Sequence, residues 1–201
     1  MDNWTDKFRQ WLGQKRRSLA RVVASWQRQV QLPAKSASTA WTEEFVEGIF
    51  RRYHFSEQAA TWLRQQVRVQ VLDSLCKSGG GLWIPEERLV RLFTAQDEAA
   101  VHELAHAWWH YRRRGRERLL IEAVVRAANE PGQRYSRVQG LAHGYIYGTP
   151  HDGWPGLLVG NNDWEMFAGL ASGTMGDIGL MPPYLRTFYE ELFEAPPSAP
   201  A

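Results

Sequence analysis

Residues 101–110, VHELAHAWWH, decide the fold class, because they place three histidines and a glutamate in an otherwise apolar, helix-like segment. Before this stretch, Thr94 and Asp97 resemble a capping box, and after it Gly115 suits a left-handed helix stop. We therefore predict one helix over residues 95–114 that carries the histidines near its middle.

Within that helix, His102 and His106 are four residues apart and lie on one face, about 6 Å apart along the axis. Both can therefore bind one metal ion. Glu103 is placed to activate a water bound to that ion, which is the arrangement of HExxH metallopeptidases. The pattern predicts Zn²⁺ as cofactor, Glu103 as catalytic base and peptide-bond hydrolysis as the reaction. His110 lies about 12 Å from His102 along the axis, so we expect it to pack nearby or to support a ligand.

A zinc site of this kind needs a third protein ligand. Glu122 has Arg126 one turn later, as in an ordinary surface ion pair, and Glu130 lies at a helix end where water can solvate it. Glu165 instead lies in the apolar segment DWEMFAGLA, where burying an unpaired carboxylate is unfavourable and a cation removes the penalty. We therefore predict Glu165 as the third ligand, with Asp163 as the next candidate.

HELAH followed later by EMFAG (residues 165–169) resembles the gluzincin metallopeptidases of the anthrax lethal factor type. In that family HExxH supplies two ligands and the first Glu of an E-F-F-A-E-like segment supplies the third. The resemblance covers residues 67–193 and implies a zincin-like domain with His102, His106 and Glu165 as zinc ligands. The second Glu of the family segment is missing here, because position 169 is glycine.

The same resemblance implies a tyrosine that stabilises the oxyanion and a strand that pairs with an extended substrate. No tyrosine lies immediately before Glu165, so Tyr145, Tyr147 and His151 remain as candidates for the oxyanion role. The strand that precedes the active helix in sequence, residues 89–93, is the expected substrate edge.

Short alternating patterns before the histidine helix predict a small β-sheet. They are VRVQVLD, residues 67–73, and GLWIP and RLVRLF, residues 81–85 and 88–93. An apolar helix is expected over residues 117–130. The Gly-, Pro- and Tyr-rich residues 136–161 are expected to be irregular.

Two further helical segments complete the predicted fold. One begins at Asn162 or Asp163, and one spans PPYLRTFYEELF, residues 182–193. The predicted fold class is α+β, a mainly helical zincin-like domain with a small sheet before the active helix. We expect this domain to span residues 40–194, after a basic amphipathic segment and linker (1–39) and before a disordered tail (195–201).

Composition narrows the function classes further. The chain has 201 residues, ten tryptophans and a single cysteine, Cys76, so no internal disulfide can form. No apolar run is long enough to span a bilayer and no signal peptide is recognisable, which predicts a cytoplasmic protein. The expected partner is a peptide or protein substrate.

Two rival functions remain. A repressor-cleaving phage-type peptidase shares the HELxHxxxH pattern, but its third carboxylate lies much closer in sequence than Glu165 does. In the other rival, a non-catalytic zincin-like protein uses residues 1–31, which are rich in basic residues and tryptophan, to bind nucleic acid, an anionic membrane surface or a partner protein. Zinc content together with hydrolysis separates the two classes.

Overall fold

The computed structural model describes residues 39–72, 80–131, 136–147 and 162–195, all within one compact unit, residues 37–201. These residues form an α+β fold that is mainly helical, with one three-stranded sheet. The expected N-terminal segment and C-terminal tail lie almost wholly outside the described residues. None of the helices within these ranges has both the length and the apolar character needed to cross a membrane.

The sheet precedes the histidine helix, as predicted. Its strands are β1 (Arg68–Val71), β2 (Gly81–Ile84) and β3 (Leu89–Leu92), in the order β1-β3-β2. β3 pairs parallel with β1 and antiparallel with β2, so both of its edges are used. The expectation that residues 89–93 form the substrate edge is therefore wrong. The short 3-10 turn η1 (Pro85–Glu87) leads directly from β2 into β3, so these strands are neighbours, and the parallel pairing with β1 makes β3 the central strand.

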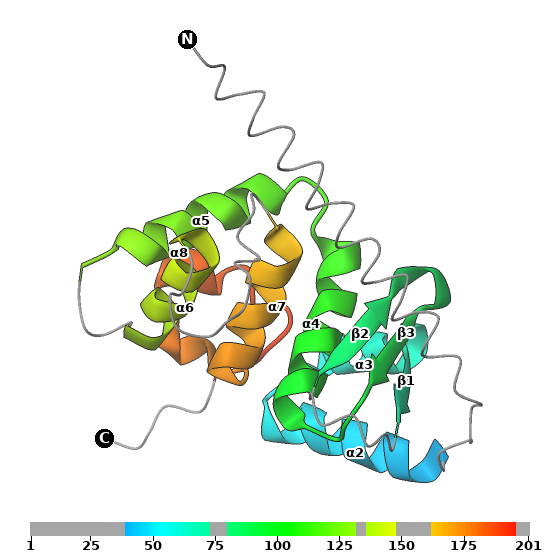
Figure 1. Cartoon of the computed structure of the whole chain (residues 1–201). Helices are drawn as coiled ribbons and strands as arrows, with labels where there is room; N and C mark the ends of the chain where they lie inside the picture. Colours follow the sequence, from blue (N-terminus) through cyan, green and yellow to red (C-terminus); the bar gives the residue numbers. More distant parts are fainter. Residues whose placement is uncertain (1–38, 73–79, 132–135, 148–161, 196–201) are drawn as a thin grey trace, which may run out of the picture. The chain divides into compact units, whose positions relative to one another are not determined.

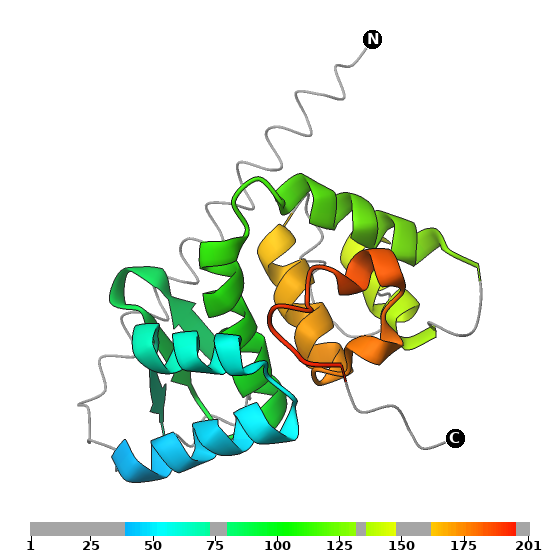
Figure 2. The ribbon, with the colours of Figure 1, turned by 180° about the vertical axis from the view of Figure 1, so that it is seen from behind.

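Two helices accompany the sheet, α2 (Thr39–Arg52) and α3 (Glu57–Gln66). The side chain of Ser56 caps α3 by accepting a hydrogen bond from the backbone N–H of Ala59. In both views of the ribbon these helices lie with the strands on one side of α4 (Figures 1 and 2).

The histidine helix is α4, Asp97–Arg112, slightly shorter than predicted. The expected capping box is wrong, because Gln96 is the N-cap residue and no side chain caps the helix. Asp97 is instead engaged by Arg52, which donates two hydrogen bonds of 3.1 Å, and by the hydroxyl of Tyr53. The first turn of α4 is thus tied to the end of α2, and Gly115 adopts the expected positive φ of 75° after the helix.

A group of helices covers the opposite side of α4 (Figure 1). It consists of α5 (Glu117–Asn129), α6 (Ser136–Tyr147), α7 (Asp163–Thr174) and α8 (Pro183–Arg186), with the 3-10 turn η2 (Ile178–Leu180). α5 and α7 confirm the prediction, and Asn162 caps α7 by accepting from the N–H of Glu165.

Two sequence expectations in this region are wrong. The start of the segment expected to be irregular, residues 136–147, is helix α6, because fully buried Val138 and Ala142 pack it into the core and override its glycines. The predicted last helix stops at Arg186, and tighter turns follow that bury Leu192 and Phe193. Residues 148–161 lie outside the described residues.

Aromatic rings form the core between α4 and α7. Trp109 of α4 stacks on Phe167 of α7 with ring centroids 4.4 Å apart, and Phe167 stacks on Tyr189 at 4.5 Å. The buried hydroxyl of Tyr189 also donates to the backbone carbonyl of Phe167. This stack fixes α7 against the histidine helix and so positions the site described next.

Candidate metal centre

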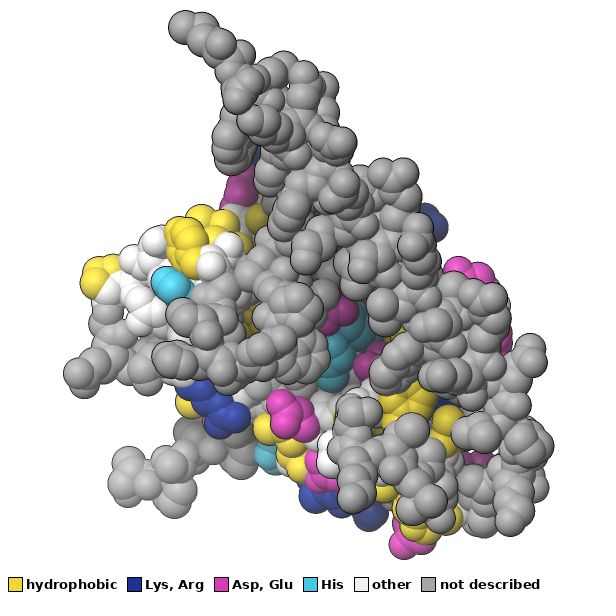
Figure 3. All heavy atoms as spheres, in the orientation of Figure 1, with side chains coloured by type: hydrophobic (Ala, Val, Ile, Leu, Met, Phe, Trp, Pro, Cys, Tyr) yellow, Lys and Arg dark blue, Asp and Glu magenta, His cyan; other side chains and the backbone are white. Residues whose placement is uncertain are grey.

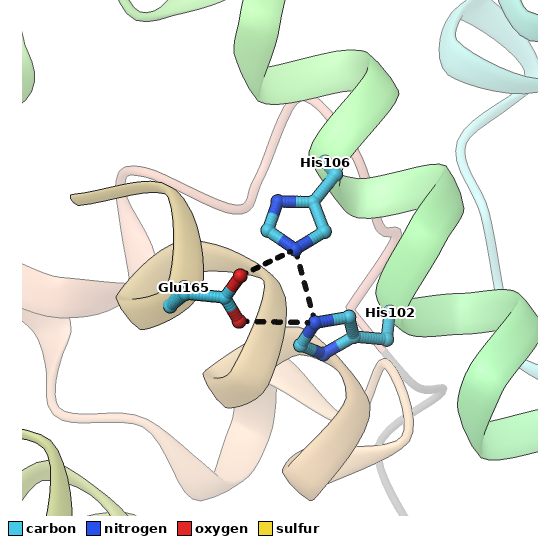
Figure 4. A group of neighbouring side chains, drawn as sticks. All are labelled: His102, His106 and Glu165. Atoms are coloured by element: carbon cyan, nitrogen blue, oxygen red, sulfur yellow. Dashed lines mark hydrogen bonds and ion pairs between the residues drawn. The ribbon is translucent and has the colours of Figure 1, made fainter. Parts of the chain in front are cut away.

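Three predicted ligands from two helices meet at one point. Nε2 of His102 lies 3.0 Å from Nε2 of His106, and these atoms lie 3.3 Å and 3.4 Å from the two carboxylate oxygens of Glu165. Figure 4 shows the carboxylate of Glu165, on α7, turned towards the two imidazole rings on α4. The structure thus brings together the residues that the sequence analysis selected, although Glu165 lies about sixty positions after the two histidines along the chain.

The geometry and chemistry of this cluster suit a divalent metal. A tetrahedral zinc ion with bonds near 2 Å separates its ligand atoms by about 3.3 Å. The two Nε2 atoms are 3.0 Å apart and each lies near a different oxygen of Glu165, and with one donor atom per residue the three donors lie within 4.8 Å of one another. Two imidazoles and one carboxylate are also the donor set of a catalytic zinc site that keeps a fourth position open. His102, His106 and Glu165 are the group of potential metal ligands found among the described residues.

The electrostatics of the cluster favour an ionised carboxylate. Burial tends to raise the pKa of Glu165, but hydrogen bonds from His102 and His106 outweigh it and hold that pKa well below its usual range. For His102, burial lowers the pKa, whereas the hydrogen bond to Glu165 and the charge of Glu103 raise it, and the net shift is upward. The carboxylate is therefore present in its ligating form, and a metal ion bound here would compete with a proton for His102.

The cluster remains open to its surroundings. The side chains of His102 and Glu165 keep 24% and 30% of their exposure, whereas that of His106 keeps 8%. The space-filling view shows histidine and acidic side chains side by side on one face (Figure 3). A small molecule or a polypeptide can thus approach from the side of His102 and Glu165.

Glu103 lies beside the cluster but is not part of it. Its side chain is 7% exposed and packs on β2, where a Cβ at Gly81 would lie 2.6 Å from Cγ of Glu103. The carboxylate accepts a hydrogen bond from the backbone of Trp83. Burial raises the pKa of Glu103, and the nearby His106 and His102 only partly oppose this. This environment suits a group that gains and loses a proton.

The other carboxylates considered as ligands have different partners. Asp163 is buried and accepts a 2.7 Å hydrogen bond from Nε1 of Trp109, so it joins α7 to α4 rather than to the cluster. Glu122 forms an ion pair on α5, but with Arg118 at 2.7 Å and not with Arg126 as expected. Glu130 accepts a hydrogen bond from the hydroxyl of Tyr184.

His110 packs among aromatic rings, as one of its two expected roles required. Its ring lies edge-on to Trp164 at 4.9 Å and to Trp83 at 6.2 Å. Burial lowers the pKa of His110, and the nearby Arg113 acts in the same direction. It is therefore a largely neutral packing residue that links β2 to α7.

The two tyrosines considered for the oxyanion role lie in different surroundings. Tyr145 lies against α7: its hydroxyl oxygen occupies the space that a Cβ at Gly169 would need, 1.6 Å away. Burial, followed by the charges of Glu165 and Glu98, raises the pKa of Tyr145 to about 12. Tyr147 is 55% exposed and exchanges hydrogen bonds with Asn129. His151 lies outside the described residues.

The sequence analysis missed two features of this site, the close fit of Tyr145 on Gly169 and a contact between His102 and Ser172. Nδ1 of His102 lies 3.4 Å from the hydroxyl of Ser172. Glu165, Gly169 and Ser172 follow one another at the i, i+4, i+7 spacing of one helix face. That spacing is readable in the sequence and was the available signal.

Comparisons of the chain with known protein families, with curated proteins and with solved structures find no match.

Proposed function

We propose that this protein is a zinc-dependent metallopeptidase of the gluzincin clan, related to the anthrax lethal factor-type catalytic domain. His102, His106 and Glu165 would hold the zinc ion. One observation carries this proposal: one donor atom from each of the three residues lies within 4.8 Å of the other two, close enough to share one ion, and a second, buried carboxylate, that of Glu103, lies beside them without joining them.

Glu103 acts as the general base. Zinc, when bound, supplies a Lewis acid that makes a water molecule acidic near neutral pH. Glu103 accepts the proton of the attacking water and later delivers it to the leaving amine. Its raised pKa supports both steps, because a carboxyl group that titrates closer to neutral pH both accepts and returns a proton readily.

Tyr145 stabilises the negative charge that develops on the substrate carbonyl oxygen. With a pKa of about 12 its phenol stays protonated at neutral pH and can donate a hydrogen bond. The recess at Gly169, one turn after Glu165 on the same face of α7, lets that hydroxyl approach the cluster. Of the tyrosines considered, Tyr145 is the one directed at this helix.

We assign the outer edge of β2 as the place where an extended substrate peptide pairs with the protein. Within the residues that the structure describes, β2 pairs only with β3, so its other edge is available for an extended peptide. The backbone of Trp83 in this strand also contacts Glu103. A peptide added to β2 would therefore run next to the general base.

The test uses the full chain. Elemental analysis of the purified protein should find about one zinc ion per chain, and a proteome-derived peptide library should be cleaved. A chelator should abolish cleavage, and added zinc should restore it. A protein without zinc overturns the proposal. A protein with zinc but no cleavage supports instead the non-catalytic alternative, a protein that binds nucleic acid, an anionic surface or a partner through residues 1–31.

A further inference from the structure

Ser172 is a buried polar residue on the face of α7 that meets the histidine helix. It is 5% exposed and lies seven residues after Glu165, two turns along the same face. Its hydroxyl oxygen lies 3.4 Å from Nδ1 of His102 and 3.4 Å from the backbone carbonyl oxygen of Gly169. The side chain thus bridges a predicted ligand to the backbone of its own helix.

The hydrogen-bond roles in this bridge are mutually consistent. Nε2 of His102 faces His106 and Glu165, so a metal held there requires the lone pair of Nε2 and leaves the ring proton on Nδ1. The Nδ1–H group then donates to the hydroxyl oxygen of Ser172. The hydroxyl proton of Ser172 donates in turn to the carbonyl of Gly169.

The two histidines differ in this respect. Nδ1 of His106 is buried and has no hydrogen-bond partner among the described residues. Its ring is surrounded instead by packed side chains, with the Trp164 ring 6.3 Å away. His102 is more exposed than His106, so packing constrains it less and a polar contact has more to add.

Position 169, which precedes Ser172 on the same face of α7, has no room for a side chain that could bond to His102 instead. Gly169 faces Tyr145 so closely that even a Cβ would meet the phenol oxygen at 1.6 Å. A longer polar side chain at position 169 would therefore displace Tyr145. Ser172, one turn further on, is where the helix can present a hydroxyl to His102.

We propose that Ser172 is a positioning residue that fixes the ring orientation and the proton position of His102 for metal binding. This inference rests on the proposed function, because it assumes that His102 is a zinc ligand. Polar groups that hold the far nitrogen of a ligating histidine typically change metal affinity by about 10–100-fold.

The test compares Ser172→Ala with Thr174→Val. Thr174 is also buried in α7, and its hydroxyl donates only to the backbone carbonyls of Leu170 and Ala171. Each variant thus removes one buried hydroxyl from the same helix. Zinc affinity is measured by competition with a chromophoric chelator, and the thermal midpoint of the metal-free protein reports on folding.

Ser172→Ala should bind zinc about 10–100-fold more weakly, while Thr174→Val should bind it like the wild type. In the zinc-loaded wild type, ¹H–¹⁵N spectra of the imidazole rings should show a protected Nδ1–H proton of His102. That signal should be lost in Ser172→Ala and kept in Thr174→Val.

Equal zinc affinity of Ser172→Ala and wild type, with the Nδ1–H signal retained, would overturn the role of Ser172 and leave the proposed function standing. An equal loss in both variants would also overturn it, because the effect would then belong to the packing of α7. A wild-type protein that binds no zinc would instead remove the proposed function itself.

Discussion

Two walls flank the candidate site, and a glutamate lies at each of them near the same pair of histidines. Glu103, on the histidine helix α4, packs against the sheet wall, which is β2 with Gly81 and Trp83, whereas Glu165 belongs to the helical wall, α7. The pKa of Glu103 is raised, because burial outweighs the nearby histidines. The pKa of Glu165 is lowered, because both histidines hydrogen-bond to it directly. Direct contact with the imidazoles, rather than residue type, therefore distinguishes the proposed ligand from the proposed base.

Removing the carboxylate of the helical wall should have the largest effect. Glu165→Ala takes away one of the three donor atoms, so zinc should fall from about one equivalent to nearly none and peptide cleavage should vanish. Elemental analysis measures the metal. Glu122→Ala, which removes an exposed carboxylate paired with Arg118, is the control and should keep its zinc. Zinc retained in Glu165→Ala but lost in Glu122→Ala would contradict the ligand assignment.

Neutralising Glu103, the carboxylate that packs against the sheet wall, should separate chemistry from metal binding. Glu103→Gln preserves shape but removes the proton acceptor, so cleavage should fall by about 10²–10⁴-fold. Zinc content and the thermal midpoint should stay close to those of the wild type. The measurement pairs steady-state cleavage rates with elemental analysis. A Glu103→Gln protein that retains zinc and cleaves at the wild-type rate would mean that HELAH holds a structural metal and does not catalyse the cleavage.

Against the helical wall, Tyr145 of α6 is the next residue to test. Tyr145→Phe should lower kcat by about 10²–10³-fold, because it removes one hydrogen-bond donor to the developing oxyanion. Zinc affinity should not change. Tyr147→Phe is the matched control, since that phenol is exposed and bonded to Asn129, and its rate should match the wild type. If the two variants behave alike, the oxyanion donor is not Tyr145.

The smallest expected effect comes from the backbone of the sheet wall. In Gly81→Ala the new Cβ would lie 2.6 Å from Cγ of Glu103 and 3.0 Å from the carbonyl oxygen of Arg91, which destabilises the fold by about 1–3 kcal/mol. Gly140→Ala, in α6, meets nothing within 4 Å and should stabilise it by about 1 kcal/mol. Denaturant unfolding measures the stability of both variants. Equal stabilities would show that β2 can shift to accommodate a Cβ beside Glu103.

Most of the elements around the histidines could be predicted because their patterns are local. The alternating residues of β1 and β3, the apolar α5 and the stop at Gly115 each depend on near neighbours in sequence. The order of the strands in the sheet does not depend on near neighbours, because it is set by which strands meet in space. Residues 89–93 were therefore wrongly predicted to form an edge. The helix at 136–147 was missed because buried Val138 and Ala142, rather than local propensity, stabilise it.

The candidate site, too, could be predicted only in part. His102 and His106 could be predicted from their helical spacing. Glu165 could be predicted because an unpaired carboxylate is unfavourable in an apolar segment. The partners of these residues depend on how α6, α7 and β2 approach, so neither Tyr145 at Gly169 nor Ser172 at His102 emerged from the sequence alone. The capping role expected for Thr94 failed for the same reason, since Asp97 bonds to Arg52, at the end of α2, and to Tyr53, which follows it.

The stack of Trp109, Phe167 and Tyr189 bears on how metal binding is driven. Its rings come from α4, from α7 and from the turns after α8, and Trp109 also donates to Asp163 at the start of α7. The two helices that carry the proposed ligands are therefore preorganised by apolar contacts that involve no metal. An incoming ion does not have to order these helices, so little of its coordination energy is lost as conformational entropy, and affinity reflects the ligand geometry itself.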